Sequence, residues 1–212
     1  MRALHIGLDL DNTIIDFEIA FVEVSRKLGL LQADEGVRSK AEVKSRLLRS
    51  SGGQEAWMRL QGQVYGHFIE KGRMQEGLAA FLDAMRRQGA RVSIVSHKTP
   101  YGHFDAQQIS LRDAARAWLD RRGFFAPDRF GLARGDLHFF DTRDEKVAAI
   151  GRIGCDAFVD DLPEVLLHPG FPGRTAAFWF APGGDVEDGG RLTPYRSWDA
   201  LRTAIESLPQ PR

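Results

Sequence analysis

The chain has 212 residues, of which 43% are hydrophobic and 27% charged, a balance typical of a globular protein with its own core. Its 29 basic and 29 acidic residues cancel, so no overall field attracts nucleic acid or an anionic membrane surface. The single cysteine, Cys155, excludes an intramolecular disulfide and a cysteine-based zinc site. No apolar run approaches the ~18 residues of a membrane span or forms a signal-peptide core. We therefore expect a cytoplasmic protein that binds neither nucleic acid nor membranes.

The first predicted element is a short buried strand over residues 3–8, which runs directly into an Asp-x-Asp sequence. Apolar residues at helical spacing then predict helices over residues 17–28 and 57–69. Between these helices, residues 36–50 are polar and basic and end in a Ser- and Gly-rich loop signal. About sixty residues after the first strand thus contain helices and no convincing strand.

From residue 77 onward, strands and helices alternate. Further buried strands are predicted over residues 91–96, 137–140, 156–159 and 175–180. Helices are predicted over residues 78–85, 111–119 and 198–208, and after Thr142. This alternation predicts an α/β fold with a parallel, doubly wound sheet. The long connection over residues 99–136 is only partly helical, and its sequence does not decide between a segment that borders the active site and an oligomer contact.

Polar side chains that could take part in catalysis or bind a metal follow several of these strands. In chain order they are the pair Asp9 and Asp11, then Ser96, then Lys146 early in a helix, and the pair Asp160 and Asp161. Each of them alone is also typical of a turn, a helix cap or a solvated side chain. In open α/β sheets, however, ligands bind at the carboxyl ends of the strands. Acidic side chains beside buried strands are costly without a cation, and a divalent metal with oxygen ligands is the simplest partner.

Taken together, these residues resemble the four motifs of the haloacid dehalogenase (HAD) superfamily: an Asp-x-Asp-x-Thr loop, a Ser or Thr, a Lys and an acidic pair. The resemblance covers most of the chain. It implies a HAD-like Rossmannoid parallel sheet in three α/β/α layers, with a small α-helical cap inserted after the first strand. Residues 17–74 would form the cap, and residues 1–16 and 75–212 the catalytic core. The Lys motif departs from the family pattern because no proline follows Lys146.

The resemblance also implies a role for each motif residue. Asp9 would attack phosphorus and form an aspartyl-phosphate, while Asp11 would protonate the leaving oxygen and later activate water. Ser96 would hydrogen-bond the phosphoryl group, and Lys146 would offset its charge. Mg²⁺ is the expected cofactor, and its ligands would be Asp161, helped by Asp160, with Asp9 and the main-chain carbonyl of Asp11. Candidate contacts to the substrate are Thr13, His97, Lys98 and Arg59.

Asp11 favours phosphatase chemistry, because the dehalogenases of this family lack an acid two residues after the nucleophile. The sequence therefore predicts a Mg²⁺-dependent phosphomonoester hydrolase whose partner is a small-molecule phosphate ester, such as a sugar phosphate or a nucleotide. Two alternatives stay open: a HAD-type phosphomutase, and a catalytically silent phosphate-binding or interaction protein on the same fold. The sequence patterns of P-loop NTPases, dinucleotide-binding proteins and Gly-x-Ser-x-Gly hydrolases are absent. A homodimer is compatible with the sequence, which does not decide the oligomeric state.

Overall fold

The computed structural model describes residues 2–32, 36–183 and 190–209. Its contacts divide the chain into two compact units. The first unit comprises Met1–Ile14, Met74–His97 and Gly123–Arg212, and the second comprises Ile15–Arg73 and Lys98–Arg122. The chain therefore passes between the units at four points.

The first unit is built on a six-stranded sheet with the strand order β5-β4-β1-β6-β7-β8, in which every pairing is parallel. The strands are β1 (His5–Leu8), β4 (Arg91–His97), β5 (Leu137–Phe140), β6 (Ala157–Asp160), β7 (Ala176–Phe180) and β8 (Pro194–Tyr195). Every residue of β1 and β6 is buried, as expected for a parallel sheet covered on both faces. The predicted α/β fold with a parallel sheet is confirmed, and the two-residue β8 adds a strand that the sequence did not predict.

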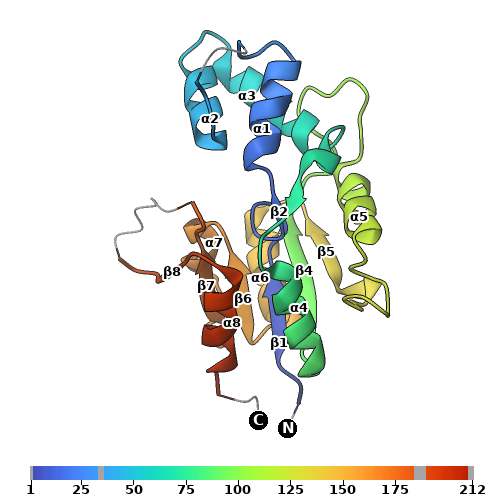
Figure 1. The fold of residues 1–212 in the computed structure, drawn as a ribbon. Helices are drawn as coiled ribbons and strands as arrows, with labels where there is room; N and C mark the ends of the chain where they lie inside the picture. Colours follow the sequence, from blue (N-terminus) through green and yellow to red (C-terminus); the bar gives the residue numbers. More distant parts are fainter. Residues whose placement is uncertain (1, 33–35, 184–189, 210–212) are drawn as a thin grey trace. The chain divides into compact units, whose positions relative to one another are not determined.

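Helices cover both faces of this sheet (Figure 1). One face carries α4 (Leu78–Arg87) and α8 (Trp198–Glu206), and the other carries α6 (Arg143–Ile153) and α7 (Pro163–Leu166), while a short 3₁₀ helix, η2 (Arg134–Asp136), precedes β5. On the first face, the ring of Trp198 packs 4.8 Å from that of Phe81 and 5.2 Å from that of Phe180. On the second face, Phe158 and Trp179 belong to an apolar cluster that includes residues of α6 and α7. Each face thus has its own buried core.

The second unit is mainly helical. Its elements are β2 (Ile15–Asp16), α1 (Glu18–Lys27), α2 (Lys40–Leu48), α3 (Gly53–Tyr65), the 3₁₀ helix η1 (Ile69–Lys71), β3 (Arg73–Met74, which ends in the first unit) and α5 (Leu111–Arg121). The strands β2 and β3 pair in a separate two-stranded sheet. The sequence analysis predicted neither these short strands nor α2. That helix starts at Ser39, whose hydroxyl accepts a hydrogen bond from the backbone of Glu42, and it buries Val43 and Leu47.

Residues 98–122 pack with the second unit, whereas the sequence analysis assigned them to a core of residues 75–212. The physical reason lies in α5. Trp118 is fully buried, and its indole N–H donates a hydrogen bond to the carbonyl of Gly72 at 3.2 Å. Arg121 and Arg122 both form ion pairs with Glu70. The role of the second unit as a cap stays a prediction.

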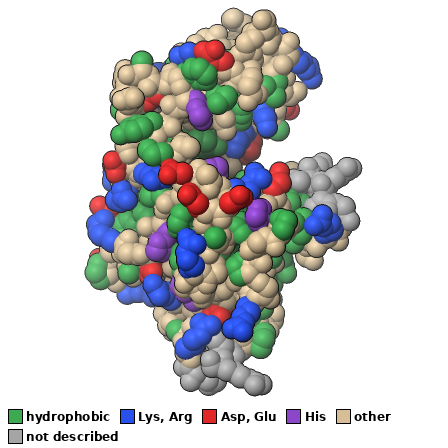
Figure 2. Space-filling model, turned by 180° about the vertical axis from the view of Figure 1, so that it is seen from behind, with side chains coloured by type: hydrophobic (Ala, Val, Ile, Leu, Met, Phe, Trp, Pro, Cys, Tyr) green, Lys and Arg blue, Asp and Glu red, His purple; other side chains and the backbone are tan. Residues whose placement is uncertain are grey.

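Two general features of the described residues are the lengths of the helices and the mixture of charges at the surface. None of the helices in the described part of the chain is long and apolar enough to cross a membrane. On the face shown in Figure 2, basic and acidic side chains are interspersed, in keeping with equal numbers of acidic and basic residues.

Candidate active site

The candidate site lies at the edge of the sheet where its strands reach their carboxyl ends. The central strand β1 lies between β4 and β6, and Leu8 is level with Ile94 on one side and Val159 on the other. Asp9 directly follows this position, and Ser96 lies two residues beyond Ile94 on the neighbouring strand. After β1, the chain adds β4 and β5 on one side of this strand and then β6, β7 and β8 on the other. Such a switch point is where open α/β sheets bind ligands.

A buried lysine between two carboxylates occupies this edge. Nζ of Lys146 donates hydrogen bonds to Oδ1 of Asp9 at 2.5 Å and to Oδ2 of Asp160 at 2.6 Å. Lys146 is carried by α6, whose start is fixed by a capping box between Thr142 and Glu145. The structure therefore brings together three of the predicted site residues from three separate elements.

Burial by itself shifts the pKa values of Asp9 and Lys146 in opposite directions, because it disfavours the charged form of each side chain. Burial raises the pKa of Asp9 to about 7, the negative charges of Asp160 and Asp11 act in the same direction, and the Lys146 ammonium opposes them. Burial alone would lower the pKa of Lys146, but the carboxylates of Asp160 and Asp9 outweigh it and hold this pKa above its ordinary value. Lys146 is therefore a fixed positive charge at neutral pH.

Asp9, Asp160 and Asp161 form an acidic cluster in which one carboxylate oxygen of each lies within 4.8 Å of the others. Asp160 uses both of its oxygens within the protein, because Oδ2 accepts from Lys146 and Oδ1 accepts from the backbone N–H of Leu162 at 2.9 Å. Several carboxylate oxygens gathered in this way fit a hard divalent cation such as Mg²⁺. The predicted contribution of the Asp11 carbonyl to that set stays a prediction.

Two buried hydroxyl groups belong to the same strand-end motifs. Thr13 is 0% exposed and Ser96 is 1% exposed, and the Oγ atoms of both have no hydrogen-bond partner within the described residues. A buried hydroxyl without a partner is unfavourable unless a ligand or water supplies one. Hydroxyl groups donate readily to phosphoryl oxygens. That Ser96 and Thr13 donate hydrogen bonds to a bound phosphate stays a prediction, and the two buried hydroxyls are compatible with it.

The turn that follows Asp9 is held by Asn12 and Gln75, which the sequence analysis did not single out. Asn12 has a left-handed backbone (φ 63°), and its Nδ2 donates to Oδ2 of Asp161 at 3.2 Å. Nε2 of Gln75 donates to the carbonyl of Asn12 at 2.9 Å. Because asparagine tolerates the left-handed region, the Asp-Asn sequence was a signal for this turn. Nothing in the sequence marks Gln75, whose partner is distant along the chain.

The other three predicted substrate contacts are His97, Lys98 and Arg59. His97 is exposed at the end of β4, where its Nε2 hydrogen-bonds the carbonyl of Asp141 at 2.9 Å. Lys98 is the first residue of a segment of the second unit and is only 3% exposed. Arg59, in α3, pairs with Glu55 and donates to a backbone carbonyl of its own unit. A substrate contact by any of these three side chains stays a prediction.

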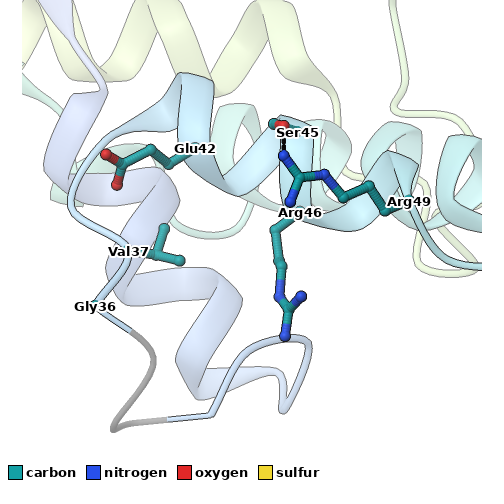
Figure 3. A pocket seen from close by; sticks show the side chains of 6 residues that line it. All are labelled: Gly36, Val37, Glu42, Ser45, Arg46 and Arg49. Carbon is teal, nitrogen blue, oxygen red and sulfur yellow. Dashed lines mark hydrogen bonds between the residues drawn. The ribbon is translucent and has the colours of Figure 1, made fainter.

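A separate hollow of about 420 Å³ lies beside α2 in the second unit (Figure 3). It is lined by Gly36, Val37, Glu42, Ser45, Arg46 and Arg49. Figure 3 shows Glu42 apart from Arg46 and Arg49, and Arg49 donates to the hydroxyl of Ser45 at 3.4 Å. These exposed side chains of both signs do not converge on one point. We therefore place no chemistry in this hollow.

No protein-family model matches the sequence, and no curated protein is significantly similar to it. Solved structures, in contrast, match over nearly the whole length of the chain. A HAD-superfamily hydrolase from Ehrlichia chaffeensis has a TM-score of 0.56 at 14% identity, and the match covers 97% of this chain and 97% of that one. YfnB from Bacillus subtilis, described as a HAD hydrolase bound to magnesium, has a TM-score of 0.59 at 12% identity, covering 97% of this chain and 99% of that one.

A phosphoserine phosphohydrolase-like protein from Francisella tularensis matches with a TM-score of 0.57 at 12% identity, covering 95% of this chain and 99% of that one. The chain has the HAD-like fold. The family resemblance read from the motifs is thereby confirmed at the level of the fold. At identities this low, roles for single residues of a HAD-like protein must rest on the geometry of its own site.

Proposed function

We propose that this HAD-like protein is a Mg²⁺-dependent phosphomonoester hydrolase that acts through an aspartyl-phosphate on Asp9. The observation that carries the proposal is the buried Asp9 carboxylate hydrogen-bonded to the buried Lys146 ammonium at the carboxyl edge of the sheet. Phosphoryl transfer needs an in-line nucleophile and neutralisation of charge on the transferring oxygens. Asp9 has a second oxygen that the Lys146 bond does not use, and this oxygen is available to a phosphorus atom or a metal.

In the proposed first step, a carboxylate oxygen of Asp9 attacks phosphorus, and the bond between phosphorus and the leaving oxygen breaks. Asp11 gives its proton to that oxygen, so the product alcohol leaves uncharged. In the second step, Asp11 takes a proton from water, which attacks the phosphorus and releases inorganic phosphate and the Asp9 carboxylate. Splitting the reaction at a covalent intermediate replaces one difficult step with two easier ones.

The other site residues stabilise charge in both steps. Lys146 keeps its positive charge beside Asp9, and the hydroxyls of Ser96 and Thr13 would gain the hydrogen-bond partners that they lack within the described residues. Asp9 and Asp161 would hold Mg²⁺, which neutralises charge on the phosphoryl oxygens when bound. The magnesium in the YfnB structure and the phosphoserine phosphohydrolase-like neighbour support this proposal.

The test is turnover of p-nitrophenyl phosphate by the purified chain. We expect activity that is lost in EDTA and restored by Mg²⁺. Asp9→Asn keeps the shape of the side chain but removes its charge and nucleophilicity, so we expect activity to fall by several orders of magnitude. The matched control is Asp144→Asn, a change of the same kind at a side chain that is 85% exposed, which should keep wild-type activity. Full activity of folded Asp9→Asn protein would disprove the mechanism.

The same assay separates the two alternatives. A phosphomutase forms the same phosphoaspartate but returns the phosphoryl group to a sugar, so it releases little inorganic phosphate. A silent phosphate-binding protein forms no covalent intermediate and turns over nothing. Release of one inorganic phosphate for each nitrophenol, with a mass increase trapped on Asp9, identifies the hydrolase. Within this proposal, the second unit acts as the cap that recognises the leaving group.

A further inference from the structure

Asp161, one of the proposed metal ligands, lies just beyond the end of β6. The strand ends at Asp160, whose two oxygens accept hydrogen bonds from Lys146 and from the backbone of Leu162. Asp161 itself is half-buried, and the side chain of Leu162 after it is exposed. The pairing of the strand therefore does not by itself set the direction of the Asp161 carboxylate, and contacts from other elements of the first unit decide it.

The indole of Trp179 holds the backbone of Asp161. Trp179 is level with Asp160 on the neighbouring strand β7, and its Nε1–H donates a hydrogen bond to the carbonyl of Asp161 at 3.2 Å. The side chain is 2% exposed and belongs to the apolar cluster that includes residues of α6 and α7. Because the packed core fixes the ring, its N–H points at a fixed place. Phenylalanine could supply an apolar ring here but no donor.

The amide of Asn12 holds the side chain of Asp161. Its Nδ2 donates to Oδ2 of Asp161 at 3.2 Å. Asn12 is fixed in turn, because its carbonyl accepts a hydrogen bond from Nε2 of Gln75 at 2.9 Å. Backbone hydrogen bonds close the turn, from Ile14 to Leu10 at 2.9 Å and from Gln75 to Ile14 at 3.0 Å. Asp161 thus has an anchored donor at its carbonyl and another at its carboxylate.

Both of these donors are uncharged groups. They orient a carboxylate without adding a positive charge, which would repel a divalent cation. Lys146 differs from them, because its ammonium group bonds directly to Asp9 and Asp160. Hydrogen-bond partners that orient a metal ligand in this way are typically worth roughly 10- to 100-fold in metal affinity. A ligand that is already oriented also loses less conformational freedom when the metal binds.

We propose that Asn12 and Trp179 are positioning residues that hold Asp161 in the direction required to bind Mg²⁺. The proposal rests on the proposed phosphatase function, in which Asp161 is a ligand of the metal. It extends that function to two residues that act through Asp161, and the sequence analysis gave neither of them a role. Their effect is on the affinity for the metal, so it can be measured without a substrate.

Calorimetric titration of the substrate-free protein with MgCl₂ tests the indole contact. We expect Trp179→Phe, which removes the indole N–H but keeps an aromatic ring, to raise the Kd for Mg²⁺ by roughly 10- to 100-fold. The matched control is Trp198→Phe. Trp198 is also buried in the first unit, but its Nε1 has no hydrogen-bond partner within the described residues. The control therefore makes the same change of volume without removing a hydrogen bond, and its Kd should equal that of the wild type.

Asn12→Gly tests the second donor in the same titration. Asn12 has a left-handed backbone (φ 63°), which glycine adopts without strain, and the carbonyl that Gln75 binds is kept. The substitution thus removes the amide, and we expect the Kd for Mg²⁺ to rise in the same range. Because Asn12 is in a half-buried turn, this variant also keeps the proposal testable if Trp179→Phe does not fold.

Two further measurements distinguish positioning from a merely structural role. Both variants should raise the Mg²⁺ concentration that gives half-maximal turnover of p-nitrophenyl phosphate, with a smaller change in kcat at saturating Mg²⁺. Urea unfolding in EDTA measures the stability of each variant without metal. A loss of stability in Trp179→Phe that Trp198→Phe shares, together with an unchanged Kd, would mean that the Trp179 ring only fills the core.

The outcomes separate this proposal from the phosphatase proposal. A Kd for either variant equal to that of the wild type overturns the role of that residue, and an equal rise in Trp198→Phe overturns the role of Trp179; both results leave phosphatase activity intact. Wild-type protein that hydrolyses the ester but binds no Mg²⁺ overturns the positioning role together with the metal. If the wild type binds Mg²⁺ and hydrolyses no ester, the phosphatase proposal fails, and the Kd values of the variants still decide the positioning role.

Discussion

Asp9 and Asp11 are two residues apart in the sequence but differ in their surroundings. Asp9 is 6% exposed and hydrogen-bonded to a buried ammonium, while Asp11 is half-buried. Carboxyl groups in different surroundings can take different parts in one reaction. In the proposed mechanism, the residue fixed by Lys146 is the nucleophile, and the less buried residue exchanges protons with the leaving group and with water.

Asp11→Asn should separate the two half-reactions of this mechanism. An amide neither donates the proton nor accepts one from water, but p-nitrophenolate leaves readily without protonation. We therefore expect phosphorylation of Asp9 to persist in part, while hydrolysis of the phosphoenzyme slows by ~10²–10⁴-fold, the usual value of acid–base assistance. The measurement is a burst of nitrophenol close to one per active site, followed by slow turnover.

Mass spectrometry provides the control for this experiment. The burst should coincide with a hydroxylamine-labile mass increase on the peptide that contains Asp9. If Asp11→Asn turns over at the wild-type rate and no phosphoenzyme is trapped, Asp11 has no part in proton transfer. The double variant with Asp9→Asn should show neither burst nor mass increase.

The strand β1 holds Asp9 in place because it is packed closely between its neighbours. Gly7 lies level with Phe158 of β6, and a Cβ atom at Gly7 would lie 2.5 Å from Cδ2 of Phe158 and 2.8 Å from Sγ of Cys155. Phe158 is fully buried and Cys155 is 4% exposed, so neither moves without disturbing the core. The position therefore requires glycine for space and for the alignment of Asp9, two residues further on.

Gly7→Ala should accordingly destabilise the first unit by about 1–3 kcal/mol, the usual cost of an added group in a filled core. It should also lower kcat for p-nitrophenyl phosphate, because β1 must shift. The measurement is the free energy of unfolding in urea. The control is Gly135→Ala, where a Cβ atom meets nothing within 4 Å, and we expect a change within about 0.5 kcal/mol. Equal stabilities of the two variants would show that β1 has room to relax.

The strands of the sheet could be predicted because their signal is local. β1 and β6 are buried throughout and β4 is buried between its two exposed end residues, so apolar residues predominate in the interior of each strand. The helix α2 was missed because only Val43 and Leu47 are buried in it, which leaves little periodicity. Its Ser-x-x-Glu start was the signal in the sequence that could have identified it.

Candidate site residues could be picked out from the sequence only where they stand at the ends of predicted strands. Asp9 and Asp160 stand at the ends of buried strands, and the family resemblance implied a charge-offsetting role for Lys146, whereas its hydrogen bonds to both carboxylates were not predicted. Gln75 acts by bonding the carbonyl of Asn12, 63 residues earlier, and such a contact has no signature in the sequence. The grouping of residues 98–122 with the second unit likewise depends on long-range packing of Trp118.

Equal numbers of acidic and basic residues leave the chain without formal net charge at pH 7, so local groups govern its response to pH. His5 is a buried group of this kind at the amino end of β1. Its Nε2 hydrogen-bonds the hydroxyl of Ser93 at 2.8 Å, and its backbone N–H donates to Asp156 at 2.9 Å. Burial lowers the pKa of His5, and the positive charge of Arg91 acts in the same direction. The cytoplasmic location stays a prediction from the sequence.

The lowered pKa of His5 predicts how this side chain contributes to stability. In the unfolded chain a histidine takes up a proton near pH 6.5, whereas folded His5 does so only at lower pH. The neutral ring therefore contributes its full stabilisation above pH 6.5, and this contribution falls as the pH decreases below that value, because the unfolded state binds the proton more readily. Asp9 acts in the opposite sense, since its raised pKa of about 7 makes the folded state bind a proton first as the pH falls. A difference measurement removes the Asp9 contribution, because Asp9 is present in both proteins that are compared.

We therefore expect His5→Gln to be less stable than the wild type at pH 7.5, and the gap between the two to narrow at pH 5.5. Glutamine can keep a hydrogen bond to Ser93 but has no proton to take up in this range, so its stability lacks the pH dependence of His5. The measurement is the free energy of urea unfolding of both proteins at the two pH values. Gly135→Ala, which alters no titratable group, provides the baseline and should differ from the wild type by the same amount at both. A gap for His5→Gln that stays constant or widens toward pH 5.5 would mean that His5 is as easily protonated in the folded protein as in the unfolded chain.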